Sequence, residues 1–510
     1  MKRILLALAA VLWASGALAA PAAPSNAIAW FEGDVDAAFA QAKRERKPLF
    51  LYWGAVWCPP CNQVKATIFN RQDFIARSRG FVPVYIDGDS PSAQALATRF
   101  KVSGYPTMVL FRADGVEVTR LPGEVEPDQY MRVLALGMHA TRPVSVLLAA
   151  VQSGRGALTP ADWRLLAYYS WDTDEQAVVP KAKVPATLTQ LALACPQDQA
   201  AAKSRLLLKA VAAAADLPDN QRPFDRATAL AQLDAVLANP ALARENFSAL
   251  TDSVSDIARS LQLSAPERER LVKAWDPLLA RWSDDGTLSR ADRLSAVDGR
   301  IELARLDAGD GALPPNLVND VRFAARRAER ETTDKYERQA VISAAAYVLR
   351  EAGLMEESDA MLKAELNRSH SPYYFMLSLA SNAKKRGDYD AAVEWYSKAY
   401  EASRGPATRL EWGARYVRAL VDMAPLDAGR IESTTRNVIG ELEAKPETFH
   451  GRSATALATL GKRVREWSEM SNQAEVLDRL RETMDAVCGK LPETAPERAT
   501  CGSMFGAKAA

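Results

Sequence analysis

The chain has 510 residues, 48% of them hydrophobic and 25% charged, so its length predicts several domains with ample apolar residues for their cores. Its 64 basic and 63 acidic residues leave a net charge near +1, which argues against nucleic-acid partners and against attraction to an anionic membrane. Five cysteines are too few to hold a chain of this length together as a disulfide scaffold.

The N-terminus has the features of an export signal. Met1-Lys2-Arg3 is basic, residues 4–12 are apolar, and Ala17-Leu18-Ala19 supplies the small residues of a cleavage site. A retained amphipathic helix fits poorly because the apolar run has no polar face. We therefore expect a signal peptide over residues 1–19, cleaved near Ala19, and a periplasmic location if the source is bacterial. No later segment is an uninterrupted apolar span, so no membrane insertion is expected.

Residues 28–140 alternate between strand and helix patterns, which predicts an α/β domain. Asp34 is a plausible N-cap for the first helix, and Asp114-Gly115 is a turn that can pair the last two strands. The expected elements in chain order are a helix over 35–46, a strand over 49–53, a helix-like run beginning at Asn62, a strand over 82–86, a helix over 92–100, strands over 108–111 and 117–121, and a helix over 128–138.

Beyond Pro143 the strand patterns almost vanish and amphipathic helical segments follow one another. Residues 141–330 are expected to form helical hairpins with no recognisable repeat. In residues 331–505 a period appears, because Gly353 and Gly387 stand 34 apart with Ala346 and Ala380 before them at matching places.

This second half resembles tetratricopeptide repeats, in which small residues let paired helices pack closely. Leu362 and Tyr396 follow the two glycines at matching places as well. Unrelated helical hairpins remain the alternative. Helical repeats form concave surfaces, so the region is expected to bind protein partners.

The stretch Trp57-Cys58-Pro59-Pro60-Cys61 lies at a predicted turn between strand and helix. A thiolate is the nucleophile in disulfide exchange, and the positive end of a helix favours that anion. Cys58 is therefore expected to be the reachable attacking thiol and Cys61 the shielded resolving one. Trp57 should form an apolar platform at the mouth of the site, while Pro59 and Pro60 complete the active-site loop.

A later proline is expected beside the sulfurs. It lies in Ser103-Gly104-Tyr105-Pro106-Thr107, and a cis Tyr105–Pro106 bond would turn the Tyr105 backbone toward the cysteines. That backbone could pair with an extended substrate segment. Gly123 is expected in the same groove, where it would allow close approach of a client chain.

These motifs, in this order, resemble the thioredoxin family, and within it the periplasmic reductase domains of the DsbD type. The resemblance covers about residues 28–140 and implies a thioredoxin fold there, and the helical patterns that follow predict a larger all-α domain. Two positions depart from the family pattern: Tyr52 replaces a buried acid, and Pro83 replaces its accompanying lysine. These departures do not support the proton relay that the resemblance would imply, so water or another carboxylate would have to deprotonate Cys61.

Two other interpretations of the cysteine pair stay open, namely a zinc site and an inert structural bridge. A closed zinc site needs four ligands, and His139, His370 and His450 show no ligand spacing, so no metal is expected. We expect no cofactor beyond a redox-active Cys58–Cys61 disulfide. The two prolines bring no positive charge between the cysteines, which favours a reductant or isomerase over a strong oxidant.

The remaining cysteines are expected to be structural. Cys488 and Cys501 are 13 apart and are predicted to form a disulfide, whereas Cys195 is predicted to be an unpaired buried residue. Asp87 and Asp89 are explained by a turn at the end of a strand.

The sequence thus predicts an exported thiol–disulfide oxidoreductase whose helical region binds partners. Its partners would be protein thiol or disulfide clients and a membrane-bound thiol donor that recharges it. The alternative is a holdase-type chaperone in which the redox domain is auxiliary.

Overall fold

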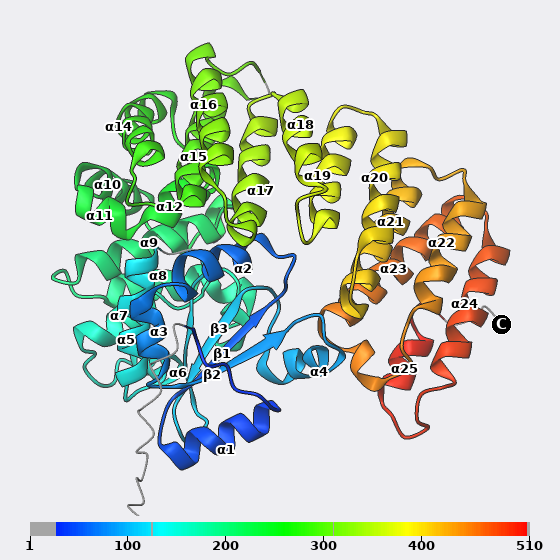
Figure 1. Cartoon of the computed structure of the whole chain (residues 1–510). Helices are drawn as coiled ribbons and strands as arrows, with labels where there is room; N and C mark the ends of the chain where they lie inside the picture. The colour runs from blue at the N-terminus through cyan, green and yellow to red at the C-terminus, as the bar shows by residue number, and fades with distance from the viewer. Residues whose placement is uncertain (1–26, 124–125, 310, 507–510) are drawn as a thin grey trace, which may run out of the picture.

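The computed structural model describes residues 27–123, 126–309 and 311–506, and the expected signal peptide lies outside them. Figure 1 shows a small α/β domain, residues 27–140, partly encircled by the helices that follow it. The predicted change from an α/β domain to an all-helical region is confirmed.

The α/β domain is built on a four-stranded sheet in the order β2-β1-β3-β4. The strands are β1 (Leu49–Gly54), β2 (Val82–Asp87), β3 (Thr107–Phe111) and β4 (Glu117–Leu121). β1 pairs parallel to β2 and antiparallel to β3, and β3 pairs antiparallel to β4. Every residue of β1 is buried because helices cover both faces of the sheet.

Two separate cores lie on the two faces of the sheet. On one face, α1 (Val35–Glu45) and α4 (Pro91–Phe100) pack against Leu51 and Val84. On the other face, α2 (Pro59–Val64), the π-helical turn η1 (Lys65–Phe69), α3 (Gln72–Ser78) and α5 (Pro127–His139) pack against Phe50. The second core continues without a break into the first helices of the helical region.

Local chemistry sets the ends of these helices. The Ala37 N–H donates to the Asp34 carboxylate at 2.7 Å, so Asp34 is the N-cap of α1. The run expected to begin at Asn62 begins instead at Pro59, because proline lacks only an N–H that the first turn leaves unpaired.

The helical region starts after α5 and contains helices of 6 to 20 residues. Its first part holds α6 (Val144–Ser153), α7 (Pro160–Ala167), η2 (Glu175–Ala177), η3 (Lys181–Lys183), α8 (Val184–Ala194), α9 (Ala200–Ala213), η4 (Asp219–Gln221), α10 (Arg226–Ala238), α11 (Pro240–Glu245), α12 (Phe247–Asp252), α13 (Val254–Leu261), α14 (Ala265–Asp284), α15 (Arg290–Ala308) and α16 (Pro315–Glu331). Its second part holds α17 (Lys335–Glu351), α18 (Met355–Glu365), α19 (Pro372–Lys385), α20 (Tyr389–Ala402), α21 (Pro406–Met423), α22 (Ala428–Gly440), η5 (Pro446–Phe449), α23 (Gly451–Met470), α24 (Ala474–Cys488) and α25 (Glu497–Gly502).

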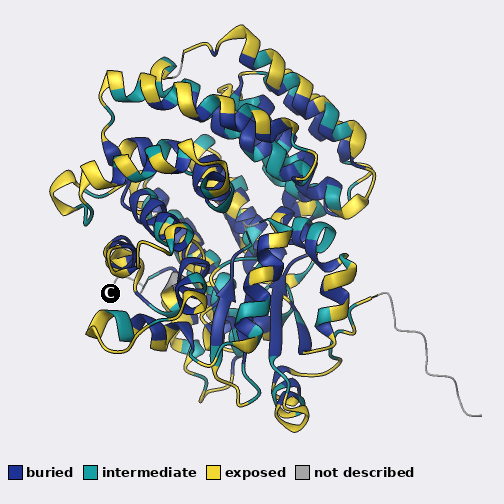
Figure 2. Cartoon of the chain, turned by 90° about the vertical axis from the view of Figure 1, so that its left-hand side faces the viewer, coloured by how far each residue is buried: buried dark blue, intermediate teal, exposed yellow. Residues whose placement is uncertain are grey.

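The helices form an arc that leaves the sheet and returns to it. In Figure 1 the arc rises along one side of the α/β domain, crosses above it at α17 to α20, and descends through α21 to α25. Besides the core that its first helices share with the sheet, the arc contacts the domain where α17 packs against α2 and where α23 and η5 pack against α4. Figure 2 shows buried residues concentrated in the sheet and on the inward faces of the helices.

The two glycines of the predicted repeat occupy equivalent positions. Gly353 lies between α17 and α18 with φ +82°, and Gly387 lies between α19 and α20 with φ +78°. Each ends the first helix of a pair in the left-handed conformation that glycine adopts readily. The assignment to tetratricopeptide repeats stays a prediction.

In the described parts of the chain, no single helix is both long and apolar enough to cross a membrane, although α5 and α6 pass the same test as a pair bent by 82°.

Candidate active site

Cys58 and Cys61 are joined by a disulfide at the beginning of α2. Cys58 is the N-cap of this helix, and the Cys61 N–H points at Cys58 Sγ from 3.2 Å. Pro59 and Pro60 fill the first two helical positions and carry no N–H, which leaves the Cys61 amide as the first-turn donor aimed at the sulfur.

The loop before β3 lies against this disulfide. The Tyr105–Pro106 peptide bond is cis, and the Tyr105 carbonyl oxygen lies 3.7 Å from Cys58 Sγ. Gly123 lies beside the proline, since a Cβ added there would come within 3.2 Å of Pro106 Cγ. The structure therefore brings together Cys58, Cys61 and the four residues predicted to bind substrate, because Trp57 also packs edge-on against Tyr105 at 6.4 Å.

Residues of the helical region also contact the loop that contains the cis proline. Asp174 accepts hydrogen bonds from Arg120 at 3.1 Å and from the Thr107 hydroxyl at 3.2 Å, and both members of the Arg120–Asp174 ion pair are almost fully buried. Ser103 donates to the Thr173 carbonyl at 2.8 Å. These contacts attach the loop to the segment that precedes η2.

The expectation that Cys58 is reachable from solvent is wrong for this state of the protein. Cys58 is 3% exposed, Cys61 is fully buried and Trp57 is 8% exposed. All three belong to the hydrophobic cluster formed by the second part of the helical region. The space left beside Trp57 and Tyr105 is about 10 Å³, the minimum that accommodates one water molecule.

Four side chains of the helical arc enclose the Trp57 indole. Its Nε1–H donates to the Thr408 hydroxyl at 2.8 Å. Tyr374 stacks on the ring at 6.0 Å, Trp412 packs edge-on at 4.9 Å, and the Arg452 guanidinium lies 5.0 Å from the ring centroid. We call these four residues, Tyr374, Thr408, Trp412 and Arg452, the Trp57 cover.

Further contacts hold the backbone of the active-site loop. His370 Nε2 donates to the Val56 carbonyl at 2.9 Å, and Gln339 Nε2 donates to the Trp57 carbonyl at 3.4 Å. His370, which showed no metal-ligand spacing in the sequence, thus makes a specific contact with the active-site loop.

Asp89 joins the α/β domain to the N-terminus of α21. Its carboxylate accepts a hydrogen bond from the Thr408 N–H at 2.6 Å, and thus caps a helix whose own N-cap residue, Gly405, has no side chain. A Cβ on Gly405 would overlap this carboxylate. Burial raises the pKa of Asp89 to about 6, and the hydrogen bonds from Thr408 oppose that rise.

Asp89 also completes the predicted strand-end turn, since its N–H donates to the Asp87 side chain at 3.1 Å.

Tyr52, the residue expected to replace a buried acid, is fully buried, and burial raises the pKa of its phenol well above the ordinary value. Its hydroxyl has no hydrogen-bond partner among the described residues. A phenol that stays neutral cannot accept the proton of Cys61, so this position supplies no general base.

The other predicted cysteines do not belong to the Cys58–Cys61 site. Cys488 and Cys501 are joined by a disulfide, and Cys195 is free and buried with its pKa raised by burial to about 11. Among the residues that the structure describes, no three His, Cys, Asp or Glu side chains gather in a way that could hold a metal ion.

Sequence reasoning missed the Trp57 cover entirely. Its members read as ordinary core positions of amphipathic helices, and Thr408 is separated from Trp57 by 351 residues. The sequence signal that could have pointed to this contact is the presence of large aromatic residues at Tyr373, Tyr374 and Trp412.

Comparisons with known proteins agree with this geometry. A family model described as a thioredoxin-like domain matches residues 35–137. The thiol:disulfide interchange protein DsbD of Klebsiella pneumoniae is 35% identical over 86 residues, which are 16% of this chain and 14% of that protein. DsbD 2 of Pseudomonas aeruginosa is 28% identical over 102 residues, which are 19% of this chain and 17% of that protein.

The thioredoxin of Mycolicibacterium smegmatis is 35% identical over 79 residues, which are 15% of this chain and 66% of that protein. A solved structure of a DsbH oxidoreductase aligns with 24% of this chain and 95% of its own, at 21% identity and a TM-score of 0.21. The chain thus spans less than a fifth of either DsbD relative, 14% and 17% of their lengths.

Proposed function

We propose that this chain, whose residues 35–137 are a thioredoxin-like domain, is an exported thiol–disulfide oxidoreductase that reduces or isomerises disulfides of client proteins. The observation that carries the proposal is the Cys58–Cys61 disulfide at a helix N-terminus, 3.7 Å from the carbonyl before a cis proline. This arrangement combines a sulfur beside a helix-terminal N–H with a backbone edge for an extended client.

The reaction proceeds in two exchanges. The Cys58 thiolate attacks one sulfur of a client disulfide, which forms a Cys58–client disulfide and releases the other client sulfur as a thiolate. The Cys61 thiolate then attacks Cys58 Sγ, forms the Cys58–Cys61 disulfide and releases the second client sulfur. Two electrons pass from the protein to the client, and water or a carboxylate takes the Cys61 proton because Tyr52 cannot.

The spent disulfide must be reduced again by an outside donor, for which we propose a membrane-bound thiol. With no charged residue between the cysteines, we expect a potential nearer thioredoxin's roughly −270 mV than the roughly −120 mV of DsbA. Redox titration against glutathione measures it, and a potential above about −150 mV would make the protein an oxidant instead.

The helical region is proposed to bind protein partners and to control access to the sulfurs. Because the Trp57 cover leaves no room for a client, turnover requires α19 to α23 to move away from the active-site loop. Export is proposed from the basic and apolar N-terminus.

Insulin reduction in the presence of dithiothreitol tests the activity. Wild type is expected to accelerate precipitation of the insulin B chain, and Cys58→Ser is expected to reduce the rate to that of dithiothreitol alone. Cys61→Ala should instead accumulate mixed disulfides with clients, because the resolving thiol is missing. A Cys58→Ser protein that matches wild type would reject the proposal.

One observation favours the second candidate, a holdase-type chaperone. The cysteine pair lies inside the hydrophobic cluster of the helical region, where a bridge could serve that region's structure alone. If Cys58→Ser suppresses client aggregation as well as wild type while neither reduces insulin, the chaperone assignment replaces the enzyme.

A further inference from the structure

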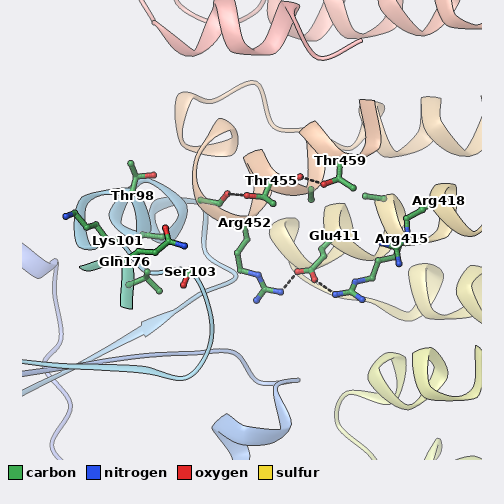
Figure 3. A pocket seen from close by; sticks show the side chains of 15 residues that line it. Thr98, Lys101, Ser103, Gln176, Glu411, Arg415, Arg418, Arg452, Thr455 and Thr459 are labelled. Atoms are coloured by element: carbon green, nitrogen blue, oxygen red, sulfur yellow. Dashed lines mark hydrogen bonds and ion pairs between the residues drawn. The ribbon is translucent and has the colours of Figure 1, made fainter. Parts of the chain in front are cut away.

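A cleft of about 670 Å³ lies between the thioredoxin-like domain and the descending part of the helical arc (Figure 3). One wall is the C-terminal end of α4 and the loop that leads to the cis proline, with Thr98, Lys101 and Ser103. The opposite wall is formed by α21 and α23. The volume is that of cavities that hold a ligand of several tens of atoms.

The cleft is strongly cationic. Four of its lining side chains are basic, and Glu411 is the one acid among them. Glu411 is already engaged, since it pairs with Arg415 at 2.8 Å and with Arg452, as Figure 3 shows. Lys101 and Arg418 are exposed and have no ion-pair partner among the described residues. An anionic ligand would satisfy both without displacing an existing pair.

One wall of the cleft follows α23. Arg452, Thr455 and Thr459 follow one another by about one turn along α23, a length of about 10 Å, which matches about three residues of extended chain. Small apolar side chains complete the lining, including Ala97, Ala414 and Ala456. An apolar surface that runs along a helix and is flanked by cations suits an extended peptide with acidic side chains.

The cleft ends at the redox site. Glu411 and Arg452 line both this cleft and the small space beside Trp57 and Tyr105. The Arg452 guanidinium lies 4.5 Å from the Tyr105 ring centroid, in addition to its contact with Trp57. A chain lying in the cleft would therefore contact the Arg452–Glu411 pair, which also borders the space beside the active-site loop.

We propose that this cleft binds an extended acidic segment of a client polypeptide, next to the cysteine that the client presents to Cys58. This inference rests on the proposed function and names its substrate class. Client carboxylates pair with Lys101 and Arg418, and a further carboxylate competes with Glu411 for Arg452. Drawing Arg452 away from Glu411 loosens one member of the Trp57 cover, so client binding favours opening of the site.

Binding is tested on the full chain with fluorescein-labelled hexapeptides that contain no cysteine. A peptide of alternating Asp and Thr is expected to bind at least about tenfold more tightly than one of Lys and Thr, and to weaken with added salt. Arg418→Glu should weaken the acidic peptide at least about tenfold. The matched control is Arg330→Glu, the same reversal at an exposed arginine of α16 that does not line the cleft.

Two results would overturn the proposal. One is equal binding of the acidic and basic peptides, or no loss in Arg418→Glu. The other is succinate competing at the same concentration as the peptide, which would make the cleft a site for small dicarboxylates.

A second measurement separates this inference from the proposed function. Reduced protein is offered disulfide-linked dimers of a cysteine peptide flanked by acidic or by basic residues. We expect the acidic dimer to be reduced faster, and the difference to vanish in Arg418→Glu. If both dimers are reduced at the same rate by wild type, only the cleft proposal fails. If neither is reduced, the proposed function fails whatever the peptides bind.

Discussion

Gly405 is the residue on which the contact between the two parts of the chain depends most directly. It has φ +85°, and the space that its Cβ would fill is taken by the Asp89 carboxylate that caps α21. Any side chain there must displace the Asp89 carboxylate, which caps α21, or move α21 itself away from the thioredoxin-like domain. Since Thr408 and Trp412 lie on α21, displacing this helix also removes half of the Trp57 cover.

We predict that Gly405→Ala exposes Cys58. After reduction, alkylation of Cys58 by iodoacetamide, followed by mass spectrometry of its peptide, should be at least about tenfold faster than in wild type, which corresponds to about 1.4 kcal/mol less stable closure. Gly387→Ala is the matched control, because Gly387 has a similar φ of +78° but nothing within 4 Å of its added Cβ. Equal rates in the two variants would mean that backbone strain, and not the overlap with Asp89, causes the effect.

Asp89 makes the contact sensitive to pH. Its pKa rises from an ordinary 3.8 to about 6 in the folded protein, with Arg452 and Asp87 as its charged neighbours. Between these values the folded state holds a proton that the unfolded state has lost, so stability falls as pH rises through this window. The contribution of Asp89 is fully favourable below about pH 4 and is lost above about pH 6.

We predict that Asp89→Asn removes this dependence while keeping an oxygen that can accept from Thr408. The difference in free energy of unfolding between wild type and variant, measured by urea titration, should change by about 1 to 3 kcal/mol between pH 4 and pH 7. Wild type loses stability relative to the variant as pH rises. A difference that is constant with pH would show that Asp89 does not titrate in this range.

At the scale of elements, local patterns were sufficient for the thioredoxin-like domain. The strand predicted over 117–121 is β4 with the same bounds, because the tight Asp114-Gly115 turn lets it pair with β3. The start of α2 was predicted three residues late because the two prolines look like a break, although the first helical turn accommodates them.

The placement of the helices could not be predicted in the same way. Periodicity identifies Trp412 and Tyr374 as residues that will be buried, but it does not identify what buries them. Both residues pack against Trp57 in another domain. This packing depends on Gly405, because the Asp89 carboxylate occupies the place that a Cβ would fill there. Such contacts depend on the shapes of two surfaces that are far apart in the sequence. A single sequence shows the residues involved only as separate apolar or small positions.

The disulfide between Cys488 and Cys501 connects the end of α24 to α25. Both sulfurs are buried, and α25 packs against η5, where His450 contacts Glu497 at 2.9 Å. The bridge therefore holds the last helix against the start of α23, the helix that carries Arg452.

Replacing Cys488 and Cys501 together by serine is predicted to lower the free energy of unfolding by about 3 kcal/mol, the loop entropy of a bridge spanning 13 residues. Urea titration of the helical signal in circular dichroism measures the change. Cys195→Ala is the control, because it removes a buried sulfur without opening a disulfide, and its loss should be clearly smaller. Equal losses would show that the bridge adds nothing beyond packing.

At the scale of the whole molecule, the helical region contacts the thioredoxin-like domain in two ways. The first helices of the arc share a continuous core with one face of the sheet, so they cannot separate without unfolding the domain. The later helices meet the domain through the Trp57 cover, the Asp89 cap and the packing of α23 and η5 on α4. The second set includes polar and charged contacts made by Asp89, Thr408 and Arg452, and we expect it to open first.

We predict that the active site opens by local separation of this second set. In reduced wild-type protein, the rate of Cys58 alkylation should increase at urea concentrations well below the midpoint of global unfolding. The free energy of opening calculated from the logarithm of this rate should depend on urea concentration with a slope smaller than the global m-value. That slope reports the surface exposed when the later helices leave the domain. Cys195 serves as an internal reference, because its place in the core shared with the sheet ties its alkylation to global unfolding. If Cys58 and Cys195 respond to urea with the same slope, the cover opens only when the entire protein unfolds, and a client cannot reach the sulfurs by way of a native-like open state.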